Sequence, residues 1–63
     1  MTQKELSYVE DAIGHEDNLI KICEETITYL EDDSLVSFMN KELKNHTQVR
    51  EELMELLEEK ANE

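Results

Sequence analysis

The chain has 63 residues and carries 17 Asp or Glu against six Lys or Arg, so its formal net charge is −11. A chain of this length supports one domain at most, and a single Cys excludes an intramolecular disulfide. The negative charge disfavours direct binding to nucleic acid or to anionic membranes, and no apolar run approaches the roughly 18 residues that a membrane span needs. The sequence therefore predicts a cytoplasmic protein whose partners are cations, basic proteins or a second copy of itself.

Two helices are predicted over residues 1–63, which form a single domain. The first covers about residues 3–31 and begins with Thr2 and Glu5, whose T-x-x-E spacing fits a capping box. The cap-forming run Asp32-Asp33-Ser34 then predicts a tight turn, with Asp32 or Asp33 as the N-cap of a second helix over about 34–60. Helix is favoured throughout because the chain has no Pro and one Gly.

Each predicted helix carries an apolar stripe at helical spacing. Most stripe residues of the first helix follow a three-and-four spacing. The whole stripe consists of Leu6, Val9, Ala12, Ile13, Leu19, Ile20, Cys23, Ile27 and Leu30. In the second they are Leu35, Met39, Leu43, Val49, Leu53 and Leu57, widened by Val36, Phe38, Met54 and Leu56. So short a turn predicts an antiparallel hairpin, and the width of the stripes predicts a homodimer that closes an all-α four-helix bundle.

A second recurrence lies on the outer edge of the first helix, where Tyr8, Ile22 and Tyr29 follow a seven-residue interval. This interval is typical of the rim of a dimer seam, and it could also mark a second association surface.

A polar layer interrupts both stripes at their centres, with Glu16 in the first helix and His46 in the second. The hairpin places these residues at about the same level, with Glu42 and Arg50 one turn to either side of His46. One interpretation is a metal site at the dimer interface, in which Glu16, Glu42 and His46 of both copies hold iron or another divalent metal. The other is a buried polar network in which Arg50 pairs with Glu16 and His46 donates to it.

The sequence does not favour an enzyme. It contains no Ser/His/Asp or Cys/His arrangement, because Cys23 and His46 fall at different levels of the hairpin, and it has no Gly-rich phosphate loop. The expected role is structural, or one of interaction with other molecules.

Several short motifs resemble the ferritin-like hairpins of the spore coat protein F type found in spore-forming Firmicutes. The matching stretches are Tyr8-Val9-Glu10-Asp11, Gly14-His15-Glu16, Asp32-Asp33-Ser34-Leu35, Phe38, Asn45-His46-Thr47 and Glu52-Leu53-Met54-Glu55-Leu56-Leu57. The resemblance implies a helical bundle, a structural role and association with the spore. The chain is also similar to half-ferritins, which dimerise and place iron at the interface. This similarity implies that Glu16 is the metal ligand from the first helix and that Glu42 and His46 are the ligands from the second. The spacing of that pair is E-x-x-x-H, whereas the usual di-metal motif is Glu-x-x-His.

Overall fold

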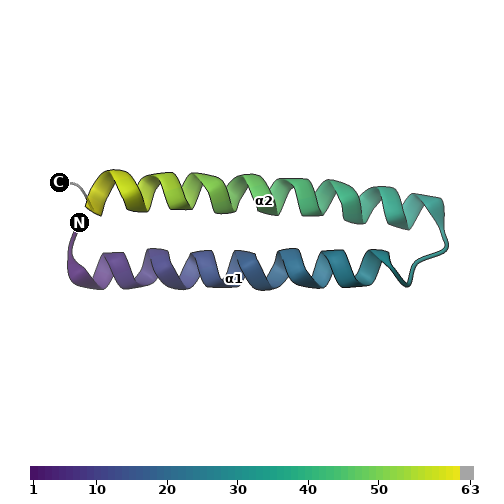
Figure 1. Ribbon diagram of the computed structural model, residues 1–63, viewed down its shortest axis with the longest axis horizontal. Coiled ribbons are helices and arrows are strands. Elements are labelled where there is room, and N and C mark those ends of the chain that lie inside the picture. Colours follow the sequence, from purple (N-terminus) through teal and green to yellow (C-terminus); the bar gives the residue numbers. More distant parts are fainter. Residues whose placement is uncertain (62–63) are drawn as a thin grey trace.

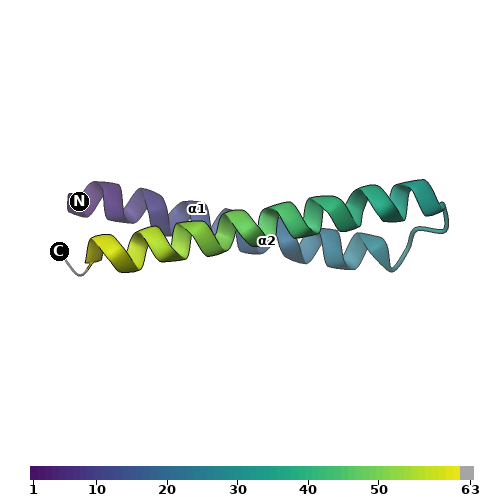
Figure 2. The ribbon, with the colours of Figure 1, turned by 90° about the horizontal axis from the view of Figure 1, so that it is seen from above.

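The computed structural model describes residues 1–61 as two helices, α1 (Gln3–Ile27) and α2 (Asp33–Ala61). They run antiparallel side by side, with the N-terminus and the end of α2 together at one end of the molecule (Figure 1). The two helices cross at a shallow angle near their middles (Figure 2). The predicted all-α antiparallel hairpin is confirmed. Neither helix combines the length and the apolar character that crossing a membrane requires.

The hairpin is a rod and not a compact globule. Its extents are 47 × 14 × 11 Å and its radius of gyration is 14.6 Å, whereas a compact domain of this length has a radius of gyration of about 10.6 Å. A rod two helices wide has a small interior, and in the part of the chain that the structure describes only Ile13 and Cys23 are buried. Each helix therefore leaves much of its surface open.

The N-terminus of α1 is closed by the predicted capping box. The backbone N–H of Thr2 donates to Oε1 of Glu5 at 2.8 Å, and the backbone N–H of Glu5 donates to the Thr2 hydroxyl at 3.1 Å. These two bonds satisfy amides that have no partner within a helix. The capping box at Thr2 and Glu5 is therefore confirmed.

The turn begins earlier than the sequence predicts, because α1 ends at Ile27 and not near residue 31. The amides of Thr28, Tyr29 and Leu30 bond to carbonyls three residues back, and the Thr28 hydroxyl donates to the Glu25 carbonyl at 2.6 Å. Three-residue bonds tighten the chain and terminate a regular helix. Of the two candidate caps of α2, Asp32 is the one whose side chain accepts from the Leu35 amide, at 3.0 Å.

A row of side chains from each helix faces the other helix, and we call these two rows the seam. The α1 row is Leu6, Val9, Ile13, Glu16, Ile20, Cys23 and Ile27, continued by Leu30 after the end of the helix, and the α2 row is Val36, Met39, Leu43, His46, Arg50, Leu53 and Leu57. The α1 row follows the three-and-four spacing of the predicted stripe. Leu19 of the predicted α1 stripe lies outside the seam and is 39% exposed. In the predicted α2 stripe, Leu35 and Val49 also lie outside the seam and are 51% and 39% exposed. Both come one position before a seam residue, which turns them about 100° away from α1.

Candidate functional site

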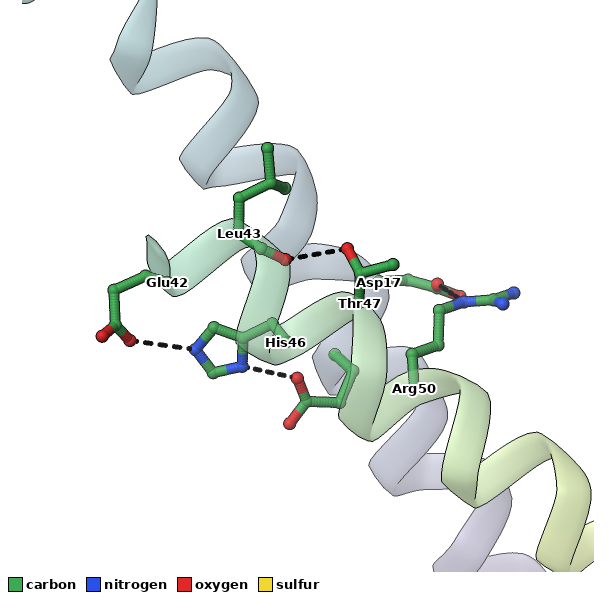
Figure 3. Close-up of polar contacts among 7 residues, drawn as sticks. Asp17, Glu42, Leu43, His46, Thr47 and Arg50 are labelled. Carbon is green, nitrogen blue, oxygen red and sulfur yellow. Dashed lines mark hydrogen bonds and ion pairs between the residues drawn. The ribbon is translucent and has the colours of Figure 1, made fainter. Parts of the chain in front are cut away.

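The polar layer predicted from the sequence forms at the middle of the seam. His46 of α2 lies between two carboxylates, with its Nδ1 2.6 Å from Oε2 of Glu16 on α1 and its Nε2 3.7 Å from Oε2 of Glu42 one turn earlier on α2 (Figure 3). Glu16 and His46 are 30 residues apart in the chain. The antiparallel hairpin brings them to one level because both occupy seam positions of the three-and-four spacing.

The chemistry of this layer depends on the protons of one imidazole ring. An ionised carboxylate can only accept a hydrogen bond, so Nδ1 carries a hydrogen when it bonds to Glu16. Nε2 can donate toward Glu42 only when the ring holds both protons. The side chains of Glu16, His46 and Glu42 are 17%, 27% and 35% exposed, so the layer is open to solvent along one side of the hairpin.

Arg50 does not join this group, although the sequence allows it to pair with Glu16. Its Nε donates to Oδ1 of Asp17, on the side of the hairpin opposite to Glu42 (Figure 3). Asp17 follows Glu16 by one position and therefore lies on the flank of α1 that the long Arg50 side chain reaches. The predicted pairing of Arg50 with Glu16 is therefore wrong. The polar contacts divide into the two around His46 and the one between Arg50 and Asp17. The neighbouring positions of Glu16 and Asp17 are the sequence signal for this division.

The metal interpretation is not complete within one hairpin. Among residues 1–61 no three His, Cys, Asp or Glu side chains are arranged so that they could hold a metal ion. Glu42 and His46 do lie four residues apart on one helix face, which is a spacing that lets two side chains reach a common ion. Cys23 is buried in the seam two turns from Glu16 and is not part of the layer.

Most of the exposed large apolar side chains gather on one side of the hairpin, and we call this side the apolar face. Leu19 comes two positions after Asp17, so it projects from the opposite flank of α1. Leu35, Val49 and Leu56 recur at seven-residue intervals with Glu42, so they share the flank of α2 on which Glu42 lies (Figure 3). The apolar face consists of Tyr8, Leu19, Ile22, Tyr29, Leu35, Phe38, Val49 and Leu56, which are between 38% and 84% exposed.

The other side of the hairpin is polar. The flank of α1 that carries Asp17 also carries Glu10 and Glu24 at seven-residue intervals. The matching flank of α2 carries Thr47 and one large apolar residue, Met54, which is 41% exposed. The exposed apolar side chains are therefore sorted by side, and a solvated surface alone gives no reason for such sorting.

We compared the chain with protein-family models, with curated proteins and with solved structures, and none of the three comparisons gave a significant match. The polar layer and the apolar face are therefore the features of the chain that bear on its function.

Proposed function

We propose that this protein is a small structural or interaction protein that works as a homodimer, in which two hairpins pack through their apolar faces into a four-helix bundle. The sorting of eight large apolar side chains onto one face carries this proposal. A single hairpin leaves these side chains in water, whereas a second copy removes them from it. A two-fold interface uses the same patch on both chains, so one sequence supplies both halves.

The exposed area supports the same conclusion. The isolated chain exposes 4971 Å², whereas a compact monomer of 7.4 kDa exposes about 4,200 Å². The excess is close to the roughly 800 Å² that each partner buries in a stable protein interface. At about 25 cal/mol per Å² of apolar surface, burial of this size exceeds the repulsion between acidic surfaces, which salt screens over about 10 Å.

Two substitutions at positions two residues apart on α2 test the proposal. Leu56 and Met54 are similarly exposed, at 38% and 41%, but they lie on opposite flanks. We expect the wild-type protein and Met54→Glu to sediment at twice the 7.4 kDa chain mass, and Leu56→Glu to sediment as a monomer or to require a much higher concentration to dimerise. A monomeric wild-type protein at micromolar concentration would refute the proposal, and so would equal weakening by both substitutions.

The resemblance to spore coat protein F hairpins supports a structural role over a catalytic one. In this proposal the acidic bundle is an associating component of the bacterial spore. Immunodetection in purified spores and in vegetative cells of the source organism tests the location. Detection in the cytoplasm of vegetative cells alone would remove the spore from the proposal and leave the dimer unaffected.

Binding of a divalent metal at the dimer interface is the second candidate function. It is favoured by the position of Glu42 and His46 on the same side as the apolar face, where two copies would bring two such pairs together. A ligand that binds only the folded state stabilises it by about 2.7 kcal/mol at a hundredfold excess over its dissociation constant. We expect ferrous, manganous or zinc ions to raise the melting temperature of the wild-type protein and of His15→Ala, but not of His46→Ala. Equal shifts in both variants would exclude this layer as the site.

A further inference from the structure

We infer that the two hairpins of the proposed dimer pack with α1 against α1 of the partner, in opposite directions, so that the two-fold axis passes near Leu19 and the two turns lie at opposite ends of the bundle. This inference rests on the proposed function, because it describes how the second copy docks. The apolar face of one hairpin is covered by the apolar face of a second copy, which runs in the opposite direction. The reasons lie in the spacing and in the charges of the two halves of that face.

The α1 half of the apolar face has a regular spacing, in which intervals of four and three residues alternate along the chain. Its positions are Tyr8, Ala12, His15, Leu19, Ile22, Thr26 and Tyr29. The midpoint between Tyr8 and Tyr29 falls between Asn18 and Leu19. An antiparallel copy centred there sets Tyr8 level with Tyr29 of the partner subunit, and it brings Leu19 to within one residue of the level of Leu19 of the partner subunit.

The exposure of the two tyrosines fits this pairing. Tyr29 is 84% exposed and Tyr8 is 60% exposed, and these are the two highest values among the exposed large apolar residues of the described chain. Tyr8 lies near the start of α1 and Tyr29 lies in the turn that follows its end at Ile27, so neither can cover the other within one hairpin. Aromatic rings that meet across an interface bury a large area and add stacking energy. The proposed axis pairs each tyrosine with the other at both ends of the α1 contact.

Charge distinguishes this arrangement from the other two-fold packing of the same faces. From Tyr8 to Tyr29 the α1 half carries no carboxylate, whereas the α2 half carries Glu42 and Glu52. If the axis ran along the rod, α1 would face α2 of the partner, and each of these carboxylates would be set against the apolar α1 half. Covering a carboxylate with apolar groups is costly unless it is paired. Packing α1 on α1 keeps the halves without carboxylates together, and it confines Glu42 and Glu52 to the contact between the two α2 halves.

Nuclear Overhauser spectroscopy of the wild-type dimer tests the inference without any substitution. Within one chain the part of α1 from Tyr8 to Ile27 spans about 28 Å, and Tyr29 lies beyond it, so a direct contact between the two rings can only be between chains. We expect cross-peaks between the ring protons of Tyr8 and Tyr29, and we expect them to weaken when the dimer is dissociated by dilution or by Leu56→Glu. Absence of these cross-peaks in a sample that sediments as a dimer would overturn the inference.

A distance between the two turns gives an independent measurement. A spin label on Glu31→Cys, in a Cys23→Ala background whose helicity and dimer mass match the wild type, should report a separation of about 40 Å, because Glu31 lies about 12 residues beyond the proposed axis in each chain and a helix rises about 1.5 Å per residue. A separation of about 20 Å, two interhelical spacings, would place both turns at one end and overturn the orientation while the proposed homodimer stands. A monomer in sedimentation would overturn both proposals.

Discussion

Glu16 and His46 meet at 2.6 Å in the middle of a seam that is otherwise largely apolar, and the bond joins the two helices at the midpoint of the rod. Both side chains are less than one third exposed. A hydrogen bond between charged or polar groups in such a setting contributes more than the same contact on an open surface. The neighbouring Asp17–Arg50 pair, whose side chains are 52% and 37% exposed, provides the comparison.

Glu16→Ala should destabilise the protein by about 1–3 kcal/mol, because it removes the acceptor of His46 Nδ1 and leaves a gap in the seam. Asp17→Ala should cost at most about 1 kcal/mol, since exposed ion pairs contribute little. Urea unfolding followed by circular dichroism at one fixed protein concentration measures both, because dimer stability depends on concentration. A larger cost for Asp17→Ala than for Glu16→Ala would contradict this ranking.

The capping box makes the N-terminus of α1 sensitive to acid. The backbone N–H of Thr2, and after it the Thr2 side chain, lower the pKa of Glu5 below its usual value of 4.5. A carboxyl group whose pKa is lowered by folding stabilises the folded state above its unfolded pKa, and this contribution is lost as the pH falls through its folded pKa. We therefore expect the first turn of α1 to fray below about pH 4.5, as amide chemical shifts of residues 2–6 would report. In Glu5→Gln those shifts should lose this acid transition. An unchanged transition would assign it to another carboxyl group.

Asp32→Ala should weaken the start of α2 by about 1 kcal/mol, because the Leu35 amide loses its side-chain acceptor. Asp33→Ala is the matched control, since Asp33 lies in the first turn of α2 and contributes chiefly through the helix dipole, by about 0.3–1 kcal/mol. Thermal unfolding at neutral pH compares the two variants. An equal effect of both would show that charge, and not the cap, governs the start of α2.

Gly14→Ala should raise stability by about 0.5–1 kcal/mol, because Gly in a helix interior is disfavoured relative to Ala. An added Cβ at this position would meet nothing within 4 Å. Gly14 lies about 140° around α1 from Leu19, away from the apolar face, so the substitution should leave the dimer mass unchanged. A loss of stability, or a change in mass, would place Gly14 in a contact that the hairpin alone does not contain.

The sequence predicts the helices, the capping box and the meeting of Glu16 with His46 because each depends on spacing within a helix or on the length of one short turn. The sequence does not determine which way a long side chain turns. For this reason it predicts Glu16 as the partner of Arg50, whereas the structure shows Asp17. For a similar reason the sequence does not separate the α2 stripe into residues of the seam and residues of the apolar face. Apolar residues fill two adjacent rows of α2. Only the position of α1 shows that Val36 belongs to the seam and Leu35 to the apolar face.

The end of α1 was predicted four residues too late because helix propensity alone cannot weigh a local competitor. The Thr28 hydroxyl donates a hydrogen bond to the Glu25 carbonyl, and the amides of the next two residues donate to carbonyls three residues earlier in the chain. Side chains that bond to nearby backbone groups offer the chain an alternative to continued helix.

Cys23 is 6% exposed and lies between the two helices, so a thiol reagent cannot reach it while they are closed. Its rate of alkylation therefore measures how often this part of the rod opens. Because Cys23 is the single cysteine of the chain, its alkylation reports helix separation at one known position. If assembly holds the helices together, the alkylation rate should fall as the protein concentration rises.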